Sequence, residues 1–137
     1  MTMSITRQSI VPPAFQAFYD AYHFSPATRV GDTIWVSGQV GIGPDMKAGE
    51  GIEAQARIAF ESLKAVLHSA GASLTDVVEL TTFHTGLRGE IEAFSAVKDA
   101  YFPAPYPSWT AVGVTQLALP ELCIEIRAVA VAGCGEG

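Results

Sequence analysis

The sequence predicts one α+β domain, a mixed β-sheet with two helices packed on one of its faces. Three observations predict this class. Segments rich in β-formers stand in pairs near both ends of the chain, two helical stripes lie between them, and no repeat or linker divides the 137 residues. The predicted order is β-β-α-β-α-β-β, and a chain of this length buries enough apolar surface to fold as one unit.

The N-terminal part of the chain has no clear period up to residue 23. An aromatic cluster there has near-helical spacing and predicts a short packing helix; it consists of Phe15, Phe18, Tyr19 and Tyr22. A hairpin follows, with strands over residues 24–30 and 33–37 joined by the turn pair Gly31-Asp32. Gly38 ends the second strand, where glycine often marks a bulge or the close approach of a ligand to the backbone.

After the glycine-rich loop of residues 41–51, residues 52–70 form the clearest predicted helix. Their apolar side chains recur in steps of three and four, and Gly71 stands at the C-cap. Residues 77–85 are rich in β-formers and predict a strand. A second helix is expected over residues 90–101, where three following prolines end it, and the last two strands over 108–115 and 122–132.

The composition limits the partners of the protein. The chain is 49% apolar and only 16% charged, which indicates that part of its surface is buried against other subunits. Its formal net charge is −6 and its eight basic residues are scattered singly, so we expect neither nucleic acid nor a membrane surface as a partner. The two cysteines suit a reducing compartment, and with no signal peptide or membrane-spanning run we expect a cytoplasmic location.

Glu125 is the main candidate for chemistry, because it is the one acid inside an otherwise apolar strand pattern. A half-buried carboxyl with a raised pKa can act as a general acid or base. Alternatively, Glu125 forms a structural ion pair with Arg127, which lies two residues further along the same strand and on the same face. The three histidines have no metal-ligand spacing and no glycine motif indicates a nucleotide, so we expect neither a metal nor a cofactor.

Several short segments, taken in their order and spacing, resemble the RidA (YjgF) family. They comprise residues 24–32, 35–41, 55–57, 63–67, 70–71, 76–78 and 124–126, and residues 82–85 and 106–115 are similar to a YjgH-like branch of that family. The resemblance implies a chorismate-mutase-like fold that assembles as a homotrimer around a central β-barrel, with ligand sites between neighbours. It also implies an N-terminal extension (1–23), a Rid-type domain (24–132) and a C-terminal tail (133–137).

The resemblance implies a site as well. Well-studied members hydrolyse reactive enamines and imines, and Glu125 matches the glutamate that holds or activates the attacking water. Trp109 stands where those members have an arginine for the substrate carboxylate, so recognition of 2-aminoacrylate-like acids should be weakened. Its indole either lines the pocket as a flat apolar wall or fills it. The other positions matched to the ligand site are Thr110, Ser37, Gly38 and Phe24.

We therefore predict a Rid-type protein that binds, and in the enzymatic interpretation hydrolyses, a small neutral or aromatic enamine, imine or carbonyl compound. The alternative is a non-catalytic ligand-binding or chaperone-like trimer. The older endoribonuclease label of the family is a third interpretation, which the acidic balance and the lack of a basic or stacking platform disfavour. A free Glu125 in a pocket favours hydrolysis, whereas a Glu125 locked to Arg127 favours binding or a structural role.

Overall fold

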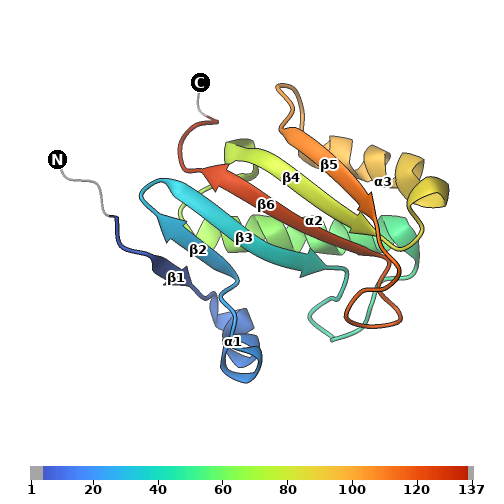
Figure 1. The fold of residues 1–137 in the computed structure, drawn as a ribbon, viewed down its shortest axis with the longest axis horizontal. Coiled ribbons are helices and arrows are strands. Elements are labelled where there is room, and N and C mark those ends of the chain that lie inside the picture. Colours follow the sequence, from blue (N-terminus) through green and yellow to red (C-terminus); the bar gives the residue numbers. More distant parts are fainter. Residues whose placement is uncertain (1–4, 136–137) are drawn as a thin grey trace.

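A six-stranded mixed sheet with the strand order β1-β2-β3-β6-β4-β5 forms the centre of the molecule (Figure 1). The structure is a computed structural model and describes residues 5–135. The strands are β1 (Gln8–Ile10), β2 (Ala27–Val30), β3 (Thr33–Val40), β4 (Val77–His84), β5 (Ser108–Gly113) and β6 (Ile124–Val131). Strands β4 and β5 run parallel, and the other neighbouring strands run antiparallel.

Two long helices, α2 (Gly51–Ser69) and α3 (Leu87–Tyr101), lie on the same face of this sheet, which confirms the predicted α+β class (Figure 1). Their apolar stripes and the inward side chains of the strands form the core. Its largest fully buried members include Phe60, Leu63, Phe94, Ile124 and Ile126. Gly71 follows α2 with a φ of +87°, which is the left-handed conformation expected of a glycine after a helix.

The first strand was missing from the sequence prediction. Strand β1 pairs with β2, with Ser9 opposite Thr28, so the sheet extends into the segment that we had set apart as an N-terminal extension. With only three residues, two of them polar, β1 is too short to show a period of two. The helix predicted from the aromatic cluster is present as α1 (Gln16–Tyr22). Residues 1–4 of the extension and 136–137 of the tail lie outside the described residues.

The alternation of side chains on β6 divides the sheet into two faces. Ile124, Ile126, Ala128 and Ala130 are buried beneath the helices. Glu125, Arg127 and Val129 therefore lie on the opposite face, which we call the open face. None of the described helices combines the length and the apolar character that a membrane span requires.

Candidate functional site

Glu125 lies in the middle of the open face, on a strand that is hydrogen-bonded on both sides. Its register partners are Val40 on β3 and Phe83 on β4, and both are partly buried. The Glu125 side chain is itself half-buried, and this burial raises the pKa of its carboxyl group above the ordinary value of 4.5. A carboxyl in this state holds a proton more readily than a solvated one and can serve as a general acid or base.

Gly38 provides the space in which the Glu125 side chain lies. A β-carbon built at residue 38 would lie 2.6 Å from Cδ and 2.9 Å from Cγ of Glu125, which is closer than real carbon atoms approach. The register between β3 and β6 shifts between Val36 and Gln39, so Gly38 lies in a bulge, one of the two features that the sequence indicated for it. The strand, which the sequence predicted to end at this glycine, continues to Val40. The structure thus brings together three predicted site residues, Ser37, Gly38 and Glu125.

Two buried glutamines fix the backbone around this carboxyl, and the sequence analysis did not select either. Gln39 donates from Nε2 to the carbonyl of Ser37 (3.0 Å) and accepts a hydrogen bond from Ser62 Oγ on α2 (2.5 Å). Gln39 therefore connects the bulge to the helix layer. An internal glutamine in a strand with glycine before it could have indicated this role.

Gln55 on α2 fixes the start of β6 in a similar way. Its Nε2 donates to the carbonyls of Gly49 (3.0 Å) and Glu121 (2.8 Å), and its Oε1 accepts from the Cys123 amide (2.9 Å). Gly41 leaves room for this side chain, because a β-carbon at Gly41 would lie 2.7 Å from the Gln55 Cα. Hydrogen bonds from α2 therefore position both β3, through Gln39, and the start of β6, through Gln55.

Glu125 and Arg127 share the open face, but they do not form the ion pair that was the alternative interpretation. The ion pairs among residues 5–135 are Arg29–Asp32 and Lys98–Asp99. Arg127 is exposed and lies opposite Thr81 on β4. The Glu125 carboxyl is therefore half-buried without a neutralising cation in the described part of the chain.

Trp109 lies on the other face of the sheet, beneath the helices. Its register partner on β4 is Leu80, a core residue, whereas Glu125 lies opposite Phe83 on the open face. The indole Nε1–H donates to Thr82 Oγ1 at 2.9 Å, and the ring centroid is 6.0 Å from that of Phe94 on α3. One chain by itself therefore does not place Trp109 and Glu125 in the same pocket.

Lys98 on α3 completes the surroundings of Trp109. Its Nζ lies 4.6 Å from the centre of the Trp109 ring, a cation–π contact, and 3.3 Å from Asp99 Oδ1. Lys98 is buried to a degree that is unusual for lysine, with only 7% of its surface exposed. The sequence analysis did not select Lys98, because a single lysine at a helical position normally points into solvent.

The remaining predicted site residues, Thr110 and Phe24, come from different parts of the fold: Thr110 lies on β5, and Phe24 lies between α1 and β2. Thr110 is exposed and alternates with Trp109 along β5, so its hydroxyl points away from the indole. Phe24 is 40% exposed and lies beside Tyr19, His23 and Ser25 around a hollow at the β2 end of the sheet. Ser37 lies between this region and Gly38, and its hydroxyl donates to the Ser25 carbonyl at 2.7 Å.

His84 is buried, and burial lowers the pKa of its imidazole, which is therefore neutral at pH 7. Its Nε2 lies 2.7 Å from Thr82 Oγ1, the atom that accepts from Trp109. Its Nδ1 has no hydrogen-bond partner among the described residues. Residues 5–135 contain no cluster of three or more histidine, cysteine or acidic side chains that could hold a metal ion.

The fold and the site define a class: a small α+β protein with a half-buried carboxyl group on the open face of its sheet, without an ion-pair partner among residues 5–135. A family model described as Endoribonuclease L-PSP matches residues 15–132. The chain belongs to this family, which includes the RidA and YjgF proteins.

Individual relatives support the same assignment. The chain is 40% identical to the RutC family protein YjgH of Escherichia coli K12 over 115 residues, which cover 83% of this chain and 88% of the relative. It is 32% identical to a 2-iminobutanoate/2-iminopropanoate deaminase of Dermatophagoides farinae, over 79% of this chain and 84% of the relative. A solved structure of protein YJGH superimposes with a TM-score of 0.83 at 38% identity, covering 92% of this chain and 96% of that one.

Proposed function

We propose that this protein is a Rid-type homotrimer that hydrolyses a small neutral or aromatic enamine or imine in clefts between its subunits. In the reaction, water adds to the carbon of the C=N bond, and the tetrahedral product breaks down to a carbonyl compound and an amine. An enamine first tautomerises to its imine. Glu125 positions the water and takes one of its protons as it adds, and the nitrogen receives that proton to give a neutral carbinolamine. Transfer of the carbinolamine's hydroxyl proton to the nitrogen, again through Glu125, then accompanies cleavage of the C–N bond. The mite relative named as an iminobutanoate/iminopropanoate deaminase is consistent with this class of reaction.

The observation that carries the proposal is the state of Glu125. Its carboxyl is half-buried, has a raised pKa and lies beside Gly38 without an ion-pair partner in the described residues. A carboxylate retained only for structure would be expected to have a cation or several hydrogen-bond donors around it, because burying an uncompensated charge is costly. Titratable groups with strongly perturbed pKa values occur mainly at functional sites, so the unfavourable burial of Glu125 indicates a catalytic role.

The placement of Trp109 supports a site made by two chains. Trp109 and Glu125 lie on opposite faces of one sheet, so a pocket that contains both must combine the β5 region of one subunit with the open face of another. The open face also exposes large apolar side chains, among them Trp35 (42%) and Val112 (37%), which subunit contacts would cover. Light scattering should therefore give a mass near three times that of the 14.5 kDa chain.

The proposed substrate class follows from the absence of an arginine at position 109. With Trp109 in place of arginine, no guanidinium is available at that position to bind a carboxylate by two hydrogen bonds, so 2-aminoacrylate-type acids should be poor substrates. Thr82 already accepts the single indole N–H, which leaves only the ring of Trp109 for an apolar or aromatic group.

The test is hydrolysis of a neutral aromatic imine, formed from benzaldehyde and a primary amine, compared with its spontaneous hydrolysis. The wild-type protein should accelerate the reaction, and Glu125→Gln should reduce the acceleration by two orders of magnitude or more, which is the usual contribution of a general acid–base group. Equal rates for the two proteins would favour the non-catalytic ligand-binding or chaperone-like trimer.

A further inference from the structure

The side chain of Trp109 belongs to a closed ring of contacts on the helix side of the sheet. Its indole N–H donates to Thr82 Oγ1 at 2.9 Å, and the same oxygen lies 2.7 Å from His84 Nε2. The imidazole of His84 meets the ring of Phe94 edge-on, with 4.8 Å between the centroids, and the Phe94 centroid lies 6.0 Å from that of Trp109. Each of these four side chains therefore contacts two of the others.

The polar half of this ring depends on the hydroxyl group of Thr82. An indole N–H can only donate, so Thr82 Oγ1 accepts from Trp109, and the hydroxyl proton of Thr82 is available to His84 Nε2. One hydroxyl thus serves both neighbours. Thr82 and His84 have no exposed surface, so loss of the hydroxyl would leave two polar groups without a partner in a place that water does not reach.

Helix α3 covers one side of the indole. Phe94 and Lys98 are four residues apart and are therefore neighbours on one face of the helix. The Lys98 Nζ lies 4.6 Å from the centre of the Trp109 ring and is attracted to its face. Thr82 thus fixes the N–H edge of the indole while α3 fixes a face. Trp109 is still partly exposed, so some of its ring remains available to a ligand.

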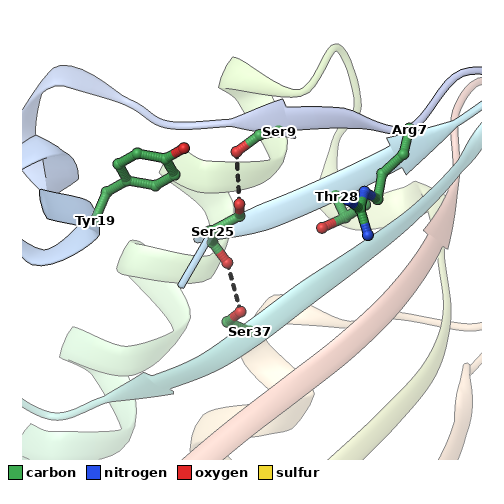
Figure 2. Close-up of a pocket in the computed structure, with 6 residues that line it drawn as sticks. All are labelled: Arg7, Ser9, Tyr19, Ser25, Thr28 and Ser37. Atoms are coloured by element: carbon green, nitrogen blue, oxygen red, sulfur yellow. Dashed lines mark hydrogen bonds between the residues drawn. The ribbon is translucent and has the colours of Figure 1, made fainter. Parts of the chain in front are cut away.

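The hydroxyl groups around the cavity in Figure 2 are in a different situation. There the hydroxyls of Ser9 and Ser25 share a hydrogen bond, and Ser37 donates to the Ser25 carbonyl. Ser9 is exposed and the other two serines are only partly buried, so water can replace these hydrogen bonds. The fully buried hydroxyl of Thr82 has no such replacement, and it therefore constrains its neighbours more strongly.

We propose that Thr82 is a positioning residue that determines substrate specificity, because it holds the Trp109 ring in the orientation that an aromatic substrate group contacts. The inference rests on the function proposed above, in which Trp109 offers its ring to the substrate. Thr82 acts through Trp109 and does not touch the reacting atoms. An indole released from Thr82 no longer presents one fixed surface, which weakens the binding of a flat aromatic group more than that of a small aliphatic one.

The experiment compares the affinities of the whole protein for benzamide and propanamide, two neutral amides of which only the first has a ring, by NMR titration. Thr82→Val keeps the shape of the side chain and removes the hydroxyl. It should weaken benzamide binding about tenfold and leave propanamide binding within about twofold of the wild type. Thr82→Ser restores the hydroxyl and should bind both amides like the wild type. The control is Thr33→Val, the same change on β3 opposite Val131, which should alter neither affinity.

A second measurement follows the indole itself. The chain has two tryptophans, so a proton–nitrogen correlation spectrum contains two indole signals, and Trp109→Leu identifies one of them by its loss. The Trp109 N–H should exchange with solvent at least tenfold faster in Thr82→Val and at the wild-type rate in Thr82→Ser. Lys98→Met keeps a side chain against the ring but removes the cation, and it should weaken benzamide binding about threefold. This variant replaces Thr82→Val in the test if Thr82→Val does not fold.

Imine hydrolysis separates this inference from the function on which it rests. On the benzaldehyde imine, Thr82→Val should raise KM about tenfold with kcat nearly unchanged, because Glu125 is untouched. An unchanged exchange rate of the Trp109 N–H in Thr82→Val would overturn the positioning role. Wild-type affinity for benzamide in Thr82→Val, or in Lys98→Met where that variant replaces it, would do the same. If the wild type fails to accelerate hydrolysis but loses benzamide binding on Thr82→Val, the proposed hydrolysis is wrong and the role of Thr82 stands.

Discussion

The side chain of Glu125 lies in the space that a side chain at residue 38 would need. A β-carbon at Gly38 would lie 2.6 Å from the Glu125 carboxyl carbon, so any other residue at this position must displace the carboxyl group or the strand. The glycine at the bulge and the acid on the neighbouring strand are therefore a matched pair. The Glu125 carboxyl can lie where it does only because residue 38 has no side chain.

Gly38→Ala tests this pair directly. The imine hydrolysis of the variant should fall because the Glu125 carboxyl is displaced, whereas its unfolding free energy should fall only slightly, because the group that must move is the end of a flexible side chain. Thermal or urea unfolding and the hydrolysis assay measure the two effects. The control is Gly89→Ala on α3, where a β-carbon would meet no atom within 4 Å and the helix gains a better helix former. Full activity of Gly38→Ala would separate the carboxyl position from catalysis.

Glu125→Gln should change stability in a way that depends on pH. Burial raises the pKa of Glu125 above 4.5, so the folded protein holds this proton more tightly than the unfolded chain does. The unfolding free energy of the wild type therefore falls as the pH rises from about 4.5 through the raised pKa of the folded state. Glu125→Gln has no ionisable group at this position and does not show this loss. Melting curves at pH 7 should place the variant above the wild type, and the difference should disappear below about pH 4.

A lower melting temperature of Glu125→Gln at pH 7 would instead indicate an ion pair between Glu125 and Arg127. If Glu125 were paired with Arg127, then Glu125→Gln and Arg127→Ala would both lower the melting temperature at pH 7, because each leaves a partly buried charge unpaired. Such a result would contradict the geometry in which Glu125 has no cation partner among the described residues.

Mixed trimers can test whether the site spans two subunits. Glu125→Gln and Trp109→Leu chains should each be impaired alone. If Glu125 and Trp109 meet across an interface, random mixing of the two in equal amounts restores both native residues at about a quarter of the sites. Co-expressed trimers that are affinity-selected for the presence of both chains carry one restored site in three, so they should recover about a third of the activity. A site formed within one chain would recover none.

Trp109→Arg alone should not create a carboxylate-binding enzyme. The new guanidinium would lie against the Lys98 ammonium group, which now lies 4.6 Å from the Trp109 ring centre, and the hydrogen bond to Thr82 would change. We expect a loss of roughly 1–3 kcal/mol of unfolding free energy from like-charge contact and lost packing. Activity on 2-aminoacrylate should stay low.

The double variant Trp109→Arg/Lys98→Gln removes the repulsion and should recover part of the lost stability in an unfolding assay. A single Trp109→Arg variant that melts like the wild type and hydrolyses 2-aminoacrylate efficiently would contradict the role assigned to Lys98.

Much of the fold follows from periodicity. The stripe of α2 and the alternation of Ile124, Ile126 and Ala128 around Glu125 are long enough to specify a helix and a half-buried strand. The same alternation predicts that Glu125 and Arg127 share a face, but not whether they pair, because side-chain geometry and neighbouring strands decide that. The pairing of β6 with β3 and β4 joins segments far apart in the chain, and no local pattern contains this information.

The site was less predictable than the fold. Matching Trp109 and Glu125 to one family pocket did not reveal that a single chain places them on opposite faces, since this depends on the register of β4 with β5 and β6. The sequence analysis also did not predict that the amides of Gln39 and Gln55 are buried, because polar residues within an apolar pattern normally face solvent. Their partners, Ser62 and the Cys123 amide, are known only once the helix and strands are placed.

The pairing of β1 with β2 has a consequence for how the chain must be produced. Residues 8–10 occupy the hydrogen-bonding edge of Ala27–Val30, which would otherwise end the sheet. A protein shortened to the family-like region from residue 24 onward would present this edge to solvent, and free strand edges recruit strands of other molecules. We therefore expect the N-terminal segment to protect the sheet against aggregation, and a shortened chain should form insoluble assemblies even though it retains α2, α3 and the five strands from β2 onward.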